Sequence, residues 1–393
     1  MTLTVLFDLD NTLLNTNFGA FLPAYFVGLG QTLADYGSQQ RIVDQIHYAV
    51  GKMTANQDPS KLLKQVFAEN FYPPLGTSEE KCRERLADFY SDAYPKLASH
   101  VKVKPEAHSL VQWCKSQGFR LAITTNPLFP ETATRQRIFW AGLDPDDFHF
   151  FSSYDTFHFT KPNLRYYAEA IGRLGWPEGP IVMVGDDLTL DVLPAGKMGA
   201  KSFWVVPGVV EPGKPQGTLT GVRAYLESLQ RRFLKFTLLN DPEVLLAVLR
   251  SSPAVLDSWL KIYEQETLHH PPREGEWSAN EVFWHLADFE EQIYLPQWRG
   301  LLKDPDQIIP HIETSHWDAV REYASRKADE ACQRFMHLRL ASLEAIESLY
   351  AQGLFERSVH HTVFSEARIG ELVAFTAKHD WLHLQQCADT MNI

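Results

Sequence analysis

The sequence predicts an α/β domain with a doubly wound parallel sheet, followed by a domain that is all helical. Residues 1 to about 222 alternate short apolar runs with amphipathic helical stretches. The runs are apolar on both faces, as expected of parallel strands covered by helices on each side. Beyond a turn-rich segment and the basic pair Arg231-Arg232, the periodicity is helical apart from loops near 270–276 and 304–310.

The elements of the first domain follow in order. The expected strands are Val5–Phe7, Leu121–Thr124, Phe148–Phe151, Ile181–Val184 and Phe203–Val206. Pro105 opens a helix that Gly118 closes, and a second helix runs from Leu164 to Gly175. An amphipathic helical stretch between about 16 and 97 interrupts the alternation directly after the first strand. Its position predicts a lid over the carboxyl edge of the sheet.

Length and composition predict two globular domains, at 1–231 and 232–393. The chain has 393 residues, of which 45% are hydrophobic and 22% charged. Its net charge of -12 argues against a general binder of nucleic acid or anionic membrane. A basic N-terminal region and a long apolar stretch are both missing, so we expect no signal peptide or membrane span and a cytoplasmic location. The cysteines lie far apart without a C-x-x-C pair, which is typical of reduced packing thiols.

Polar side chains follow the predicted strands at their carboxyl ends, where an open α/β sheet places its ligand crevice. In strand order they are Asp8 and Asp10, then Thr125-Asn126, then Lys161-Pro162, then Gly185-Asp186-Asp187 with Asp191 farther along. Unpaired buried charge is expensive, so acids placed there usually hold a metal or react.

This set of residue types suits phosphoryl transfer through a carboxylate. One Asp can attack phosphorus, and a second Asp two residues on can protonate the leaving oxygen and then deprotonate water. Further carboxylates can hold Mg²⁺, which prefers oxygen ligands. A Thr hydroxyl and a Lys can bind the remaining phosphoryl oxygens.

The ordered set resembles the four motifs of the haloacid dehalogenase (HAD) superfamily over residues 1–222. The motifs are Asp8-Leu9-Asp10-Asn11-Thr12-Leu13, Thr125-Asn126, Lys161-Pro162 and Gly185-Asp186-Asp187-Leu188-Thr189-Leu190-Asp191. The resemblance implies a Rossmann-like HAD core whose helical insertion is the substrate-selecting cap.

The resemblance also implies roles for individual residues. Asp8 would be the nucleophile and Asp10 the general acid/base, while Thr125, Asn126 and Lys161 would bind the phosphorylated substrate. Asp186 would ligate Mg²⁺ beside Asp8 and the Asp10 carbonyl, with Asp187 as a further ligand or a neighbour of the ligands. Asp191 would orient Lys161.

Asp10 favours a phosphatase within this superfamily. Dehalogenation displaces halide without an acid at the second position, and the dehalogenating members lack that Asp. A phosphonate hydrolase would need a cap lysine able to form an imine. Lys52, Lys61 and Lys64 are available, and nothing in the sequence marks one out.

The second domain contains histidines at metal-ligand spacing. Ser278-Ala279-Asn280-Glu281 is a capping box that opens a helix with His285 on the flank of its apolar stripe. Near the end of the chain, His379 and His383 lie one helical turn apart on one apolar face. Two imidazoles at this spacing and a third from another helix form a three-nitrogen site with open positions. Hydrogen-bonded core histidines are the alternative.

This arrangement resembles the DinB-like metal-binding four-helix bundles over roughly 240–390. The matching segments are Trp277-Ser278-Ala279-Asn280-Glu281-Val282, His285-Leu286-Ala287-Asp288 and His379-Asp380-Trp381-Leu382-His383. The resemblance implies that His285, His379 and His383 ligate a divalent transition metal. Imidazole suits Zn, Ni, Cu or Fe. Some relatives are thiol-dependent transferases or isomerases.

The leading interpretation is a Mg²⁺-dependent phosphatase of a small phosphorylated metabolite, fused to a metal-binding bundle. Two alternatives centre on the bundle. In one it senses a ligand or thiol in a stress-response protein whose α/β half has lost turnover, and intact Asp8 and Asp10 count against that. In the other it is a thiol-dependent transferase with an accessory HAD domain. A small thiol and a homodimer through the bundle are the further partners considered, with no nucleic acid and no membrane.

Overall fold

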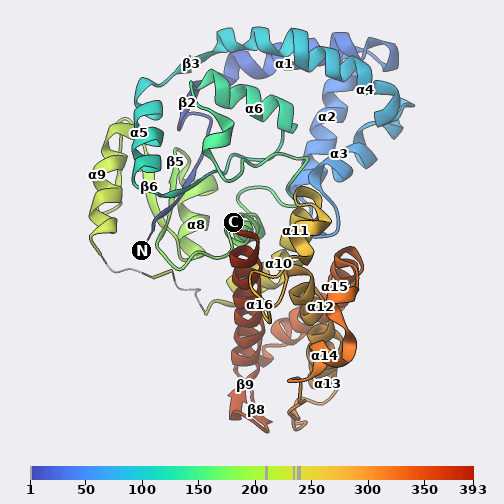
Figure 1. Ribbon diagram of the computed structural model, residues 1–393. Helices are drawn as coiled ribbons and strands as arrows, with labels where there is room; N and C mark the ends of the chain where they lie inside the picture. The colour runs from blue at the N-terminus through green and yellow to red at the C-terminus, as the bar shows by residue number, and fades with distance from the viewer. Residues whose placement is uncertain (1, 209–210, 233–234, 237–239) are drawn as a thin grey trace. The chain divides into compact units, whose positions relative to one another are not determined.

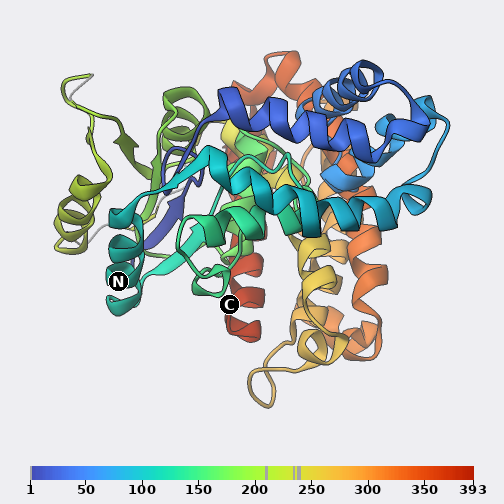
Figure 2. The same cartoon turned by 90° about the horizontal axis from the view of Figure 1, so that it is seen from above.

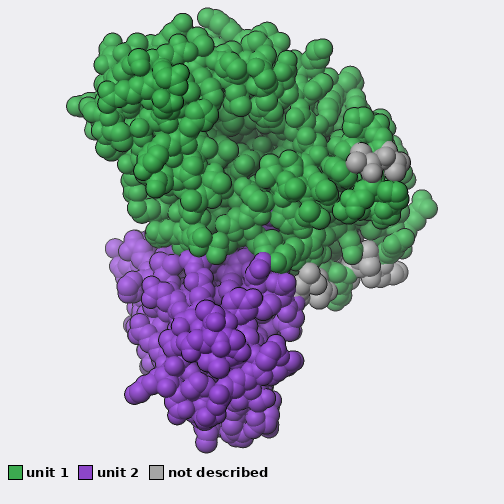
Figure 3. Space-filling model, turned by 180° about the vertical axis from the view of Figure 1, so that it is seen from behind, with its two compact units in different colours: residues 1–166, 178–237 green, residues 167–177, 238–393 purple. Residues whose placement is uncertain are grey.

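The computed structural model describes residues 2–208, 211–232, 235–236 and 240–393. The chain divides into two compact units, coloured separately in Figure 3. Unit 1 comprises Met1–Tyr166 and Glu178–Thr237, and unit 2 comprises Tyr167–Pro177 and Leu238–Ile393. Residues 233–234 and 237–239, which follow the predicted joint at 231/232, lie outside the described residues. The boundary at 231/232 therefore stays a prediction.

Unit 1 is built on a five-stranded parallel sheet, which confirms the predicted α/β class (Figure 1). Its order is β4-β1-β5-β6-β7. The strands are β1 Thr4–Phe7, β4 Arg120–Ile123, β5 Ile181–Gly185, β6 Lys201–Val205 and β7 Gln216–Gly217. Strand β1 pairs with β4 on one side and β5 on the other, with Val5 opposite Leu121 and Val182. The carboxyl ends of these three strands therefore meet at one edge.

The predicted strand at Phe148–Phe151 is wrong. The segment forms a single bridge, between Phe151 and Ile123, and β7 supplies the fifth strand instead. Its backbone still runs beside β4, because the His149 amide donates to the Leu121 carbonyl at 2.8 Å. A 3₁₀ turn, η5 Pro145–Asp147, immediately precedes it. The Phe148 amide donates to the Pro145 carbonyl of that turn at 3.2 Å, so the start of the segment does not join a ladder with β4.

Helices cover both faces of this sheet. Those of unit 1 are α5 Pro105–Ser116, α6 Glu131–Trp140, α8 Leu193–Lys197 and α9 Leu219–Gln230. Helix α7 Leu164–Arg173 falls mostly in unit 2. Val5 and Phe7 belong to one core cluster with residues of α5 and α9, while Leu6, on the opposite face of β1, is also fully buried. Burial on both faces explains the continuous apolar runs. Helix α5 begins at Pro105 as predicted, and Gly118, with φ +68°, follows its end.

A helical insertion, which we call the cap, occupies residues 17–100 of unit 1, and helices are expected from the sequence over about 16–97. Its helices are α1 Phe18–Thr32, α2 Gln39–Thr54, α3 Leu63–Phe71 and α4 Glu79–Asp88, with the short turns η1 Ala34–Tyr36, η2 Pro73–Leu75, η3 Phe89–Ala93 and η4 Tyr94–His100. Helix α1 packs beside the run formed by α4, η3 and η4, blue and cyan in Figure 2. The unpredicted strands β2 Leu14–Thr16 and β3 Val101–Val103 pair antiparallel at the two ends of the cap.

Unit 2 contains the predicted four-helix bundle. Helices α10 Pro242–Ile262, α12 Ala279–Phe289, α15 Ala328–Ala351 and α16 Ile369–Met391 pack so that each contacts two neighbours. Helix α12 continues through the π-turn η7 Glu290–Tyr294 into α13 Leu295–Lys303. The Ser278–Glu281 capping box is confirmed, with the Glu281 amide 3.3 Å from the Ser278 hydroxyl.

The remaining elements of unit 2 are short. They are α11 Gln265–His269, α14 Trp317–Arg321, η8 Tyr323–Ser325, η9 Leu354–Glu356 and the hairpin β8 Ser358–His361 with β9 Ser365–Arg368. The hairpin departs from the all-helical prediction. Among the described residues, none of the helices combines the length and apolarity needed to span a membrane.

Candidate functional site

The predicted catalytic residues of unit 1 meet at one edge of the sheet. Asp8 follows β1, Thr125 lies just beyond β4, and Asp186 follows β5. They line a cavity of about 540 Å³ between the sheet edge and the cap. Asp10, Asn126, Lys161, Asp187 and Asp191 line the same cavity. The structure therefore brings all the predicted unit 1 site residues to one place.

Lys161 links two of the acids. Its Nζ lies 2.8 Å from Oδ1 of Asp8 and 2.5 Å from Oδ1 of Asp191, and all three side chains are buried. The contact with Asp191 agrees with the predicted orienting role. Gly185 makes room for Asp191, because a Cβ atom there would lie 2.3 Å from Oδ2 of that carboxylate.

Asp8, Asp186 and Asp191 form a group that could hold a cation, since their carboxylate oxygens lie within 4.8 Å of one another. Burial raises the pKa of Asp8 despite the attraction of Lys161. Burial raises the pKa of Asp186 to about 6 and that of Asp191 to about 7. The negative charge of Asp8 raises the pKa of both groups as well. A hard divalent cation would offset this buried negative charge, so the donor set fits Mg²⁺.

Asp187 lies outside that group of three. Its Oδ1 accepts hydrogen bonds from the amides of Thr189 and Leu190, at 2.7 and 2.9 Å, and thereby caps the turn η6 Leu188–Val192. These bonds lower the pKa of Asp187 although partial burial opposes them. Of the two roles implied for Asp187, a neighbour of the ligands is the one that this geometry favours.

Thr125 and Asn126 accept hydrogen bonds from residues of the segment 152–166. The Thr125 carbonyl accepts hydrogen bonds from Ser152 at 2.5 Å and Tyr166 at 2.8 Å. The Asn126 side-chain oxygen accepts one from the Lys161 amide at 3.2 Å. This network fixes the loop that follows β4 against the segment carrying Lys161.

Two cations at the site were missed by the sequence analysis. Arg137, fully buried in α6, lies 2.5 Å from Oδ2 of Asp10 and stacks 4.4 Å from the centre of the Phe129 ring. The other carboxylate oxygen of Asp10 accepts from Thr16 at 2.7 Å. Lys104 donates to the carbonyls of Asn11 and Thr12. Arg137 occupies an ordinary helical position in the sequence, and no local signal distinguishes it from a surface arginine.

The cap lysines considered for imine chemistry do not line the cavity. Lys61 pairs with Glu69 at 2.7 Å, and Lys64 pairs with Glu79 and Asp155, both at 3.3 Å. Lys52 lies over the Tyr48 ring. This arrangement gives none of the three access to the reacting carboxylates.

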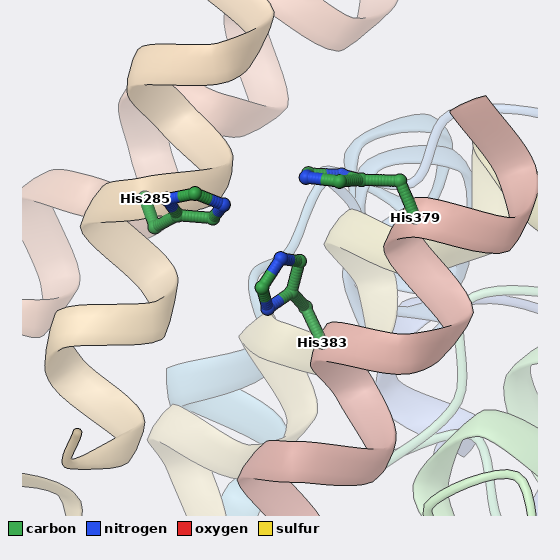
Figure 4. Close-up of side chains that lie close together, drawn as sticks. All are labelled: His285, His379 and His383. Atoms are coloured by element: carbon green, nitrogen blue, oxygen red, sulfur yellow. The ribbon is translucent and has the colours of Figure 1, made fainter. Parts of the chain in front are cut away.

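In unit 2, His285, His379 and His383 lie together. Figure 4 shows His285 on one helix facing His379 and His383 on another, which are α12 and α16. One ring nitrogen from each lies within 4.8 Å of the others. Burial lowers the pKa of His285 to about 3, and the pKa values of His379 and His383 are lowered as well. The imidazoles are therefore neutral at physiological pH, which metal binding requires.

The hydrogen bonding of these histidines fits a metal site. Both ring nitrogens of His379 are buried and have no hydrogen-bond partner among the residues that the structure describes, which is costly for a core histidine and expected of a ligand. His383 Nδ1 donates to the Gln386 side-chain oxygen at 3.0 Å, which leaves Nε2 as the ligand atom. Phe289 stacks on His379 with ring centres 4.6 Å apart.

A buried ion-pair network lies next to the histidines. Arg339 of α15 donates to Glu290 at 2.6 Å and to Asp380 at 3.1 Å, and all three side chains are at most 1% exposed. Asp380 directly follows His379. The network therefore joins α15, α16 and the end of α12 where the histidines are held.

Fold and site together define a hydrolase core with carboxylates and a lysine at the carboxyl edge of a parallel sheet, fused to a bundle with three clustered histidines. Residues 2–199 match the family model of the haloacid dehalogenase-like hydrolases, and the chain belongs to that family. Residues 249–387 match the DinB superfamily model. Both sequence resemblances are confirmed.

Individual relatives share a quarter or so of their residues with this chain. Pyrophosphatase PpaX of Halalkalibacterium halodurans is 26% identical over 265 residues, 65% of this chain and 95% of the relative. A Geobacillus kaustophilus protein whose name describes it as a candidate metal-dependent hydrolase is 28% identical over 141 residues, 35% of this chain and 74% of the relative. A crystal structure of a HAD phosphatase from Thermococcus onnurineus is 26% identical, covers 57% of this chain and 98% of its own, and gives a TM-score of 0.37.

Proposed function

We propose that unit 1 is a Mg²⁺-dependent phosphatase that hydrolyses a small phosphate monoester through an aspartyl-phosphate. The observation that supports this most is the contact of Lys161 with both Asp8 and Asp191, beside Asp186, at the carboxyl edge of the sheet. Asp10 favours phosphate over halide chemistry, and one relative, PpaX, is named a pyrophosphatase.

Each of these residues has a distinct role in the proposed reaction. Asp8 attacks phosphorus, and the bond from phosphorus to the leaving oxygen breaks. Asp10 gives that oxygen a proton and later removes one from the water that hydrolyses the aspartyl-phosphate. Lys161 and Thr125 bind the non-bridging oxygens, and Asp191 holds Lys161 in position. A Mg²⁺ bound by Asp8, Asp186 and the Asp10 carbonyl would supply positive charge that shields the nucleophile from the anionic substrate.

The test is hydrolysis of p-nitrophenyl phosphate with Mg²⁺ by wild-type protein and by Asp8→Asn. The amide has the shape of the carboxylate but cannot attack phosphorus, so we expect kcat to fall by a factor on the order of 10³ or more. Asp146→Asn is the matched control, because that side chain is 84% exposed. Turnover by Asp8→Asn at the wild-type rate would refute the mechanism.

For unit 2 we propose that His285, His379 and His383 bind one divalent transition metal, such as Zn, Ni or Fe. The unpartnered nitrogens of His379 support this. Three protein ligands leave room for water or a substrate group such as a small thiol. The thiol and a homodimer through the bundle stay predictions.

A further inference from the structure

The cavity that contains the carboxylates is apolar where it enters the cap. Except for the exposed His47, the cap residues that line it are aliphatic or aromatic, and they come from α1 to α4 and η3. Phe26, Val50, Phe67 and Leu86 are representative. Charged side chains among the described lining residues belong to the core, at the sheet edge. Charged side chains therefore reach the cavity from the core, whereas the cap contributes mainly apolar surface.

The cap residues contribute few polar atoms to the cavity, namely the hydroxyls of Tyr25, Tyr72 and Tyr90 and the ring of His47. The hydroxyls of Tyr25 and Tyr90 bond to each other at 2.8 Å. Burial raises the pKa of Tyr25 to about 12, so its phenol is uncharged. A sugar or amino-acid group entering this part would find few hydrogen-bond partners, and each of its polar groups left unpaired would cost about 1–3 kcal/mol. An apolar group would gain free energy in the same space.

The walls of this cavity are held in place by contacts between cap and core. The amides of Leu63 and Lys64 donate to the carbonyls of Phe157 and Tyr154, at 2.9 and 2.8 Å. The rings of Phe67 and Tyr154 are nearly parallel, with centres 5.9 Å apart. The cavity volume of about 540 Å³ is well beyond what one phosphate group fills.

We infer that the substrate of this site is a phosphate monoester of an apolar alcohol or phenol, such as a medium-length alkyl or an aryl phosphate. This inference rests on the proposed phosphatase function. The phosphate lies among Asp8, Lys161 and Asp186, and the hydrocarbon lies against the cap residues. Cleavage breaks the bond from phosphorus to the leaving oxygen, and one water is consumed to yield the alcohol and inorganic phosphate.

The experiment measures kcat/KM with Mg²⁺ for ethyl, butyl, hexyl and octyl phosphate, with glucose 6-phosphate as the polar comparison. At about 0.8 kcal/mol for each buried methylene, kcat/KM rises about fourfold per methylene until the cavity is full. We expect kcat/KM for glucose 6-phosphate to be lower than that for butyl phosphate. A flat dependence on chain length, or a preference for glucose 6-phosphate, overturns the inference while the phosphatase function stands.

Two valine variants test whether the cap surface produces this trend. Val50→Asp places a carboxylate on the cavity wall. We expect it to lower the ratio of kcat/KM for octyl phosphate to that for ethyl phosphate by about tenfold or more. Val27→Asp changes an exposed cap valine (40%) that does not line the cavity, and it keeps the trend. Circular dichroism melting of both variants checks that they fold. If both variants lose the dependence of kcat/KM on chain length to the same extent, the assignment of the cap lining as the binding surface is wrong.

Binding separates this inference from the proposed function. Calorimetric titration of the Asp8→Asn protein with the same alkyl phosphates and Mg²⁺ measures affinity without turnover. Affinity that rises with chain length supports the apolar site. If the wild type at the same time hydrolyses none of the esters, the phosphatase function is refuted but the inference about the apolar site is not. Affinity independent of chain length overturns the inference.

Discussion

Asp8 and Asp10 lie two residues apart but are held by different cations. Asp8 contacts Lys161, whereas Asp10 contacts Arg137 and Thr16. The first pair places a nucleophile beside a phosphate-binding ammonium. The second fixes both oxygens of the proposed proton donor. Arg137 does not belong to the recognised motifs, so we regard it as a positioning residue that acts through Asp10.

Arg137→Met should therefore slow hydrolysis of esters whose leaving oxygen needs a proton. We expect kcat for butyl phosphate to fall about tenfold to a hundredfold, because Asp10 is no longer held in place. The loss for p-nitrophenyl phosphate should be smaller, since p-nitrophenolate leaves without protonation. Arg137→Lys keeps the charge and should restore part of kcat. Equal losses for both esters would show that Arg137 has only a structural role.

His379 and His383 should decide the transition-metal content. They share one turn of α16, which presets their spacing, and His285 completes the set from α12. Elemental analysis of purified wild type should give about one transition-metal ion per chain, and the His379→Ala, His383→Ala double variant should give close to none. His337→Ala, an exposed histidine of α15, is the control. Equal metal in wild type and double variant would make these histidines ordinary core residues.

At the scale of elements, the cap should control specificity and not the chemical step. Thr16 of β2 lies opposite Val101 of β3, so an Asn-Gly turn can replace residues 17–100 as a two-residue hairpin. The shortened protein should keep some hydrolysis of p-nitrophenyl phosphate and lose discrimination among larger esters, because the apolar wall is gone. The measurement is kcat/KM across the ester series. Discrimination equal to that of the wild type would refute the cap assignment.

The histidines joining α12 and α16 should make the metal-free bundle sensitive to acid. The ordinary histidine pKa is 6.5, and burial lowers that of His379 well below it. Below about pH 6.5 these imidazoles become protonated in the unfolded chain but stay neutral in the folded protein. The free energy of unfolding therefore falls as pH drops from 6.5, on the order of 1 kcal/mol per buried imidazole by about pH 5.5.

Urea titration of metal-free protein at about pH 7.5 and about pH 5.5 measures this loss. Asp186 and Asp191, whose pKa values are raised, contribute in the opposite sense, so the readout is the difference between variants. His379→Leu should reduce the pH-dependent loss, and the exposed His337→Leu should not. A loss unchanged by His379→Leu would contradict the prediction.

For the whole molecule, two groups of ligands of different chemistry predict two separable metal requirements. Carboxylates favour Mg²⁺ and imidazoles favour a transition ion. Treatment with 1,10-phenanthroline should strip the transition metal and leave Mg²⁺-dependent hydrolysis of p-nitrophenyl phosphate within about twofold of its starting rate. Metal content and turnover are measured on the same sample. Loss of turnover that only the transition metal restores would show that hydrolysis depends on the bundle.

Much of the fold was predictable because its signals are local. The strand runs at Val5, Leu121 and Ile181, the helix opened by Pro105 and the Ser278 capping box each depend on neighbouring residues. The short strands β2, β3, β8 and β9 were missed, since three or four residues give little periodicity. Phe148–Phe151 had the composition of a strand, but the preceding turn engages the Phe148 amide and the segment forms a single bridge.

The sequence by itself determined the two domain classes, the order of the acidic motifs and the histidine spacing, because parallel strands bring their carboxyl ends together and a helical turn brings residues four apart onto one face. Only the tertiary structure decided which groups hold these residues. Arg137 reaches Asp10 across 127 positions of sequence, and the apolar wall is assembled from separate cap helices. Such contacts depend on how distant elements pack, and no local pattern encodes that.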